Sequence, residues 1–112
     1  MMHTRTGFGI VGCGSISAIH AAAIARLPQA YLAGMVDTNI AYAQAAAQRH
    51  GTRAYHTVEE LLAYKAVDIV SLCTPSGLHT PQALQALHAG KHVVVEKPLA
   101  LTLADADAVI EA

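Results

Sequence analysis

The stretch FGIVGCGSIS, residues 8–17, joins a short apolar run to a glycine turn. Its first four residues are almost continuously apolar, which is typical of a strand buried in a parallel sheet. Residues 15–27 after the turn have the character of a helix that stops before Pro28. A strand, a GxGxx-small turn and a helix in this order predict a dinucleotide-binding unit. The turn alone is a weak signal, because a glycine-rich turn can also exist without a ligand.

Each position of the turn has a physical role in holding a pyrophosphate. Gly12 permits the tight turn, and Gly14 lets the backbone approach the phosphates. Ser15 and Ile16 open a helix whose free N–H groups and positive dipole end favour anions. The third small position is Ser17, where Gly or Ala is usual, so we expect a small shift of the helix. The Ser17 hydroxyl is available to hold a phosphate or to cap the helix.

Short apolar runs and longer helical segments alternate along the rest of the chain. We expect strands at 8–11, 31–36, 53–56, 67–72 and 92–95, and helices at 15–27, 40–50, 57–64, 80–89 and from 102 onward. This order predicts an α/β fold, a doubly wound parallel sheet of the Rossmann type with right-handed crossovers. We assign residues 1–112 to one dinucleotide-binding domain, incomplete at its C-terminus. Thr80 followed by Pro81 predicts that Thr80 is the N-cap of the fourth helix and Pro81 its first helical residue.

Asp37 strengthens the nucleotide interpretation, because it follows the second strand, where an acid can bind both hydroxyls of the adenosine ribose. A carboxylate there repels a 2′-phosphate, and no basic residue occurs between Arg26 and Arg49, so NAD is favoured over NADP. Asp37 could also be a turn or helix-cap aspartate. Methyltransferases that bind S-adenosylmethionine use a similar turn and acid, but the later motifs argue against them.

The bulk composition excludes several classes of partner. A net charge of −1 and the lack of any basic run give no reason to expect nucleic acid or an anionic membrane. No apolar stretch approaches the roughly 20 residues that span a bilayer. We therefore expect a cytoplasmic protein in which Cys13 and Cys73, at the ends of neighbouring strands, are reduced. His88 and His92 have a metal-like spacing, but Gly90 breaks the helix between them, so no metal site is expected.

Two further motifs follow the fourth and fifth strands, CTPSGLH at 73–79 and Glu-Lys-Pro at 96–98. Together with the glycine turn and Asp37, they make the chain resemble the Gfo/Idh/MocA family of oxidoreductases over nearly its whole length. The resemblance implies that Thr74 and Pro75 border the nicotinamide ribose, with His79 nearby.

Glu96 and Lys97 belong to the motif that is most specific for this family. The resemblance implies that Glu96 lies near the nicotinamide end of the cofactor. It also implies that Lys97 reaches the substrate hydroxyl as a catalytic residue, because a cation there can stabilise developing alkoxide charge. Each residue also has a plainer interpretation: Lys97 and Glu96 as surface residues at a strand end, and His79 as a residue that merely precedes a helix.

The substrate implied by the resemblance is a sugar, nucleotide-sugar or cyclitol, oxidised at a secondary alcohol. Ser76 stands where the family often has asparagine, which resembles the subgroup that oxidises UDP-linked N-acetylated amino-sugar uronates at carbon 3. Family members have a second α/β domain that supplies the substrate pocket, a proton-accepting histidine and usually the oligomer interface. We expect a homo-oligomer, and no turnover from residues 1–112 alone. The alternative is a non-catalytic NAD-binding or assembly module.

Overall fold

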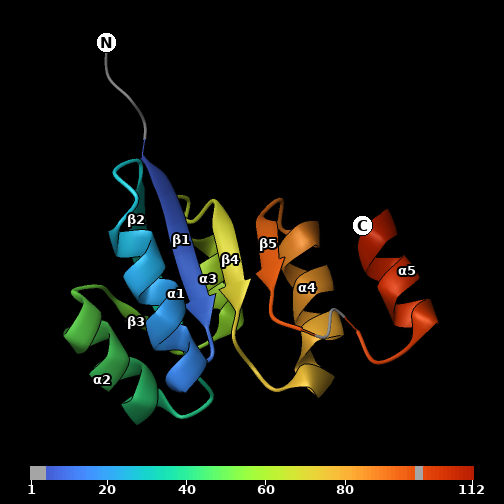
Figure 1. Ribbon diagram of the computed structural model, residues 1–112, viewed down its shortest axis with the longest axis horizontal. Helices are drawn as coiled ribbons and strands as arrows, with labels where there is room; N and C mark the ends of the chain where they lie inside the picture. Colours follow the sequence, from blue (N-terminus) through green and yellow to red (C-terminus); the bar gives the residue numbers. More distant parts are fainter. Residues whose placement is uncertain (1–4, 98–99) are drawn as a thin grey trace.

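A computed structural model describes residues 5–97 and 100–112 (Figure 1). Its strands are β1 (Thr6–Val11), β2 (Ala30–Val36), β3 (Ala54–Tyr55), β4 (Ile69–Leu72) and β5 (His92–Val95). Its helices are α1 (Ser15–Ala25), α2 (Ile40–His50), α3 (Val58–Ala63), α4 (His79–His88) and α5 (Leu103–Glu111), with a 3₁₀ turn, η1, at Ser76–Leu78. The strands form one parallel sheet in the order β3-β2-β1-β4-β5. The predicted Rossmann-type fold is confirmed.

Two apolar cores lie on opposite faces of this sheet, because neighbouring residues of a strand point to opposite sides. On one face, Ile10 and Met35 pack with buried residues of α1 and α2. On the other face, Val11 and Val70 pack with buried residues of α3 and α4. The near-continuous apolar sequence of β1 follows from this double burial.

Local capping sequences set the helix boundaries that the sequence predicts best. Asn39 caps α2 by accepting from the N–H of Ala41, and Gly51 ends the helix in the left-handed conformation at φ 68°. Thr57 and Glu60 form a complete capping box at the start of α3. These caps are made by residues close in sequence, so they can be recognised without knowledge of the tertiary structure.

The prediction that Thr80 caps the fourth helix is wrong. Helix α4 begins at His79, two residues before Pro81 and directly after the turn η1, and no side chain caps it. The turn itself takes the place of a cap, since the N–H of Leu78 donates to the Pro75 carbonyl and the N–H of His79 to that of Ser76. Pro81 remains in the first turn of the helix, where a missing N–H costs little.

The strand order reverses at β1, because β2 and β3 lie on one side of it and β4 and β5 on the other. In open parallel sheets a crevice forms at the carboxyl ends of the strands where this reversal occurs. Strand β5 lies at the edge of the sheet next to β4, and α5 lies beyond it beside α4 (Figure 1). Among the described residues, no helix has the length and apolar character needed to cross a membrane.

Candidate functional site: a cavity at the carboxyl ends of β1, β2 and β4

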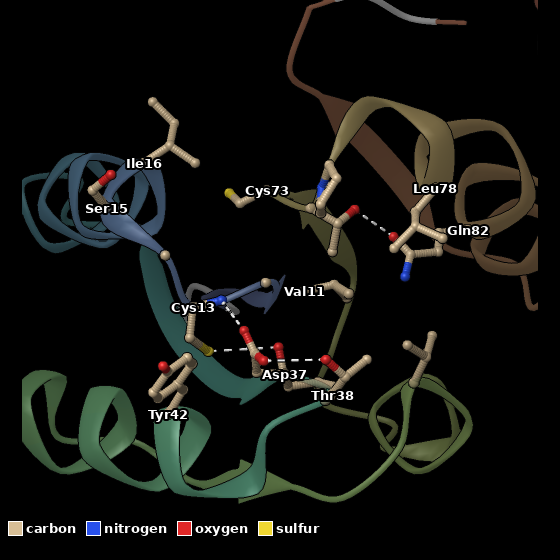
Figure 2. Close-up of a pocket in the computed structure, with 16 residues that line it drawn as sticks. Val11, Cys13, Ser15, Ile16, Asp37, Thr38, Tyr42, Cys73, Leu78 and Gln82 are labelled. Carbon is tan, nitrogen blue, oxygen red and sulfur yellow. Dashed lines mark hydrogen bonds between the residues drawn. The ribbon is translucent and has the colours of Figure 1, made fainter. Parts of the chain in front are cut away.

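A cavity of about 580 Å³ opens where the strand order reverses, within the size range of pockets that hold small ligands (Figure 2). One wall comes from the glycine turn and the end of β2, and the facing wall from the segment after β4 and the start of α4. The cavity is lined by Val11, Gly12, Cys13, Gly14, Ser15, Ile16, Val36, Asp37, Thr38, Tyr42, Val58, Cys73, Thr74, Pro75, Leu78 and Gln82.

The two glycines of the turn have different surroundings. Gly12 has φ 95°, and a Cβ built on it would lie 2.8 Å from the Cys73 carbonyl carbon and 2.9 Å from the Thr74 nitrogen. A side chain at Gly12 is therefore excluded both by backbone conformation and by the neighbouring strand end. A Cβ on Gly14 would meet no atom within 4 Å. Gly14 thus leaves open space at the cavity, which a ligand can approach closely.

The N-terminus of α1 points its free backbone groups toward this space. Gly14 is the cap residue and no side chain caps the helix. Within residues 5–97 and 100–112, the N–H groups of Gly14, Ser15 and Ile16 donate to no acceptor. Ser17 is buried, and its hydroxyl donates to the Gly14 carbonyl at 2.6 Å, so it closes the first turn and does not face the cavity. The N–H groups and the positive end of the helix dipole suit a bound phosphate.

Asp37 stands at the end of β2 with its carboxylate held in place by backbone donors. Its Oδ2 accepts from the Cys13 N–H and its Oδ1 from the Asn39 N–H, each at 2.8 Å. The Thr38 hydroxyl lies 3.5 Å from Oδ1. Each carboxylate oxygen can accept two hydrogen bonds, so Oδ2 keeps capacity for a ligand hydroxyl. The hydrogen bond to Cys13 also ties the acid directly to the glycine turn (Figure 2).

Two cysteines line the cavity, and both are free thiols. Burial, with a smaller contribution from the Asp37 charge, raises the pKa of Cys13 to about 11, although Arg49 acts in the opposite direction. Burial, followed by the charges of Glu96 and Cys13, raises the pKa of Cys73 to about 12. Both thiols are therefore protonated at neutral pH and are poor nucleophiles. They serve as small apolar surface in the cavity wall.

The segment after β4 contributes Thr74 and Pro75 to the cavity, but His79 lies outside its lining. The His79 ring is 1% exposed, and its Nε2 is 2.8 Å from the Thr74 carbonyl oxygen. The Thr74 hydroxyl donates to Gln82 Oε1 at 2.6 Å. The structure therefore gathers seven of the ten predicted site residues around one cavity: Gly12, Gly14, Ser15, Ile16, Asp37, Thr74 and Pro75.

Glu96 and Lys97 follow β5 and are not among the residues that line the cavity. Glu96 Oε1 contacts Nε2 of His20, a residue in the second turn of α1. This contact joins helix α1 to the end of the edge strand. Lys97 is exposed. Pro98, the last residue of the predicted motif, lies outside the described residues.

Sequence reasoning missed several residues of the cavity wall, notably Tyr42, Val58, Leu78 and Gln82. Tyr42 lies in the first turn of α2, which starts just after Asp37, so its nearness to the acid could have been anticipated from spacing. Gln82 is one helical turn after His79 on α4, which also starts at the carboxyl edge. Val58 comes from the start of α3, and no local pattern indicates that it faces a cavity.

Several known dehydrogenases are similar to this chain in sequence. UDP-N-acetylglucosamine 3-dehydrogenase of Acidithiobacillus ferrooxidans is 40% identical over 110 residues, which are 98% of this chain and 33% of that protein. Myo-inositol 2-dehydrogenase of Thermotoga maritima is 34% identical, over 92% of this chain and 31% of that protein. The chain thus spans about a third of the length of these relatives.

The similarity extends to solved structures. The WlbA dehydrogenase of Bordetella pertussis, in complex with NADH and UDP-GlcNAcA, superposes with a TM-score of 0.92 at 41% identity, over 96% of this chain and 33% of that one. KijD10, a 3-ketoreductase of Actinomadura kijaniata in complex with NADP and TDP-benzene, has a TM-score of 0.91 at 27% identity, over 96% of this chain and 34% of that one. The family described as "Oxidoreductase family, NAD-binding Rossmann fold" matches residues 6–112, so the chain belongs to the Gfo/Idh/MocA oxidoreductase family.

Proposed function

We propose that this chain binds NAD in the cavity at the carboxyl ends of β1, β2 and β4. The pyrophosphate would lie against Gly14, Ser15 and Ile16, and the adenosine ribose against Asp37. The observation that carries the proposal is that a hydrogen-bond acceptor and several donors lie next to each other in the cavity. The Asp37 carboxylate is hydrogen-bonded to the glycine turn, and N–H groups of the same turn lack partners among the described residues. The fit is good, because the donors suit phosphate and the acceptor suits ribose hydroxyls.

NAD is proposed over NADP because of the charge at Asp37. A 2′-phosphate placed at the ribose would meet a carboxylate whose two oxygens already face backbone N–H groups. Like charges at such short range are unfavourable, and NADP-binding relatives of this fold usually place an arginine nearby. KijD10, a more distant neighbour, was solved with NADP, so the fold itself does not decide this choice.

The activity we propose is hydride transfer between the nicotinamide ring and a secondary alcohol of a sugar, nucleotide-sugar or cyclitol. A bound nicotinamide cofactor would supply the hydride acceptor. Lys97, exposed after β5, would donate a hydrogen bond to the substrate hydroxyl and stabilise negative charge that develops on its oxygen. The hydroxyl proton would pass to a proton-accepting histidine of the kind that family members carry in their second α/β domain. The WlbA structure contains UDP-GlcNAcA, which supports a UDP-linked N-acetylated amino-sugar uronate as the substrate class.

A calorimetric titration of the chain with NAD, NADP and S-adenosylmethionine tests the binding proposal. We expect NAD to bind most tightly and S-adenosylmethionine not to bind. The Asp37→Ala variant should lose about tenfold or more in NAD affinity, since a ribose hydrogen bond to a charged group is removed. Equal affinity for NAD in the wild-type chain and the variant would show that Asp37 does not bind the ribose.

A chimera tests the catalytic proposal. Residues 1–112 would replace the matching third of the Acidithiobacillus ferrooxidans dehydrogenase, and NADH formation would be followed with its UDP-sugar substrate. We expect turnover in the chimera and a loss of at least about a hundredfold in kcat for Lys97→Met, within the range found when one charge-stabilising donor is removed. A folded chimera that binds NAD but shows no turnover would favour the alternative, a non-catalytic NAD-binding module.

A further inference from the structure

Two residues of helix α4 form hydrogen bonds with Thr74, one with its hydroxyl and one with its backbone carbonyl. The Thr74 hydroxyl donates to Gln82 Oε1 at 2.6 Å, and the Thr74 carbonyl oxygen lies 2.8 Å from His79 Nε2. A carbonyl oxygen can only accept a hydrogen bond, so Nε2 of His79 carries the hydrogen and donates it. His79 and Gln82 are three residues apart on α4, so both lie on the same face of the helix.

Thr74 occupies a critical place in the cavity. Its backbone nitrogen is 2.9 Å from the position that a Cβ on Gly12 would occupy. The segment after β4 therefore packs against the glycine turn too closely for any side chain at Gly12. Thr74 also lines the cavity. A change in the position of Thr74 would therefore alter both the facing wall and the support of the glycine turn.

His79 itself does not line the cavity, and its ring is almost completely buried. Burying a polar ring is unfavourable unless its nitrogens are hydrogen-bonded, and a hydrophobic residue at this place would avoid that requirement. The partner of Nε2 is the backbone carbonyl of Thr74, a residue that lines the cavity. This hydrogen bond connects the buried ring of His79 to the wall of the cavity.

We propose that His79 is a positioning residue: by donating to the Thr74 carbonyl it holds the Thr74 wall in the shape that accepts the cofactor. Gln82 supports the same residue through the hydroxyl. His79 acts through Thr74 and makes no contact with the ligand. This inference rests on the proposed binding of NAD in the cavity. It adds a residue that influences the affinity for NAD although it does not line the cavity.

The test compares His79→Gln with His79→Phe. In glutamine the amide nitrogen is as many bonds from Cα as Nε2 is in histidine, so it can still donate to Thr74; phenylalanine keeps the ring volume and removes the donor. We expect the Kd for NAD, measured by calorimetry, to rise about fivefold in His79→Phe, as for one lost hydrogen bond, and to stay within about twofold of wild type in His79→Gln.

A matched control separates positioning from general stability. Val67→Ala removes a buried side chain at the opposite end of the sheet, so it should lower the free energy of unfolding and leave the Kd for NAD unchanged. If His79→Phe fails to fold, His79→Asn replaces it, because its shorter amide cannot reach the Thr74 carbonyl; the same loss of affinity is expected.

Each outcome decides between the two proposals. Wild-type affinity in a folded His79→Phe or His79→Asn variant would overturn the positioning role and leave NAD binding intact. A His79→Gln variant that binds as weakly as His79→Phe would also overturn it. Absence of NAD binding by the wild-type chain would instead overturn the proposed function, and the positioning role with it.

Discussion

The half of the molecule around β1, β2 and α1 differs sharply from the half formed by β5 and α5. In the first, Ile10 and Met35 are fully buried, and backbone N–H groups hold the Asp37 carboxylate. In the second, Val94 is 43% exposed and α5 contains no buried residue. The groups proposed to bind NAD are thus fixed by this fold, whereas Lys97 is exposed at the end of an edge strand. The surrounding structure therefore fixes the groups proposed to bind the nucleotide far more firmly than it fixes the proposed catalytic lysine.

The largest effect is expected where the two strand ends meet at Gly12. Gly12→Val forces a β-branched residue into a conformation with φ 95° and against the backbone of Cys73 and Thr74. We expect it to cost more than about 3 kcal/mol and to leave little folded protein, as judged by circular dichroism during urea unfolding.

Gly14→Ala is the matched change in the same turn. Its methyl group meets no atom of the chain within 4 Å, so the free energy of unfolding should change by less than about 1 kcal/mol. The affinity for NAD should nevertheless fall, because the methyl group projects where the phosphates would approach. Similar stability in the two glycine variants would show that Gly12 is not constrained as described.

Core substitutions in the two halves provide the next comparison. Ile10→Ala, at a position 0% exposed in the central strand, should lower the free energy of unfolding by about 2–5 kcal/mol. Val94→Ala in β5 should change it by less than about 1 kcal/mol, because much of the side chain already contacts solvent. A large loss in Val94→Ala, measured by urea denaturation, would mean that β5 is as well packed as β1.

The reactivity of Cys13 reports on the burial of the glycine turn. With the pKa raised by burial from 9.0 to about 11, the thiolate at pH 9 is scarce, so alkylation by iodoacetamide should be about fiftyfold slower than in the urea-unfolded chain. The stabilisation linked to the neutral thiol is complete below pH 9 and is lost as the pH rises through about 11. Equal alkylation rates in the two states, followed by mass spectrometry, would contradict this burial.

The smallest expected effects concern two threonine caps with the same chemistry. Thr57→Ala removes the capping box of α3, whose Leu61 is fully buried, and should cost about 1 kcal/mol in global stability. Thr102→Ala removes the cap of α5, which has no buried residue, so it should affect local fraying of that helix far more than global unfolding. Amide hydrogen exchange of α5, measured beside urea unfolding, separates the two effects.

The sequence predicts the fold well because its strongest signals are local. The helix α2 was expected at residues 40–50 and occupies that range, since Asn39 and Gly51 act on neighbouring backbone groups. Strand β5 also matches its predicted range of 92–95. The start of α4 differs from the prediction because the turn at Ser76–Leu78 replaces a side-chain cap.

Some residues of the candidate site could likewise be predicted from local motifs, and others could not. The glycine turn and Asp37 form recognisable motifs, and they lie together in the cavity as expected. Val58, at the start of α3, follows no such pattern, so only the packing of the whole sheet shows that it shares the wall with Tyr42 and Gln82. The contact between His20 and Glu96 joins residues 76 apart in sequence, beyond the reach of any local pattern.

The most direct test of the central claim is an NMR titration of the ¹⁵N-labelled chain with NAD. If the cavity at the reversal of strand order binds the cofactor, amide resonances of Gly14, Ser15, Asp37 and Thr74 will shift with saturation. Resonances of residues 103–111 in α5 will stay unchanged. Unshifted resonances at the glycine turn, or shifts concentrated in α5, would contradict the account.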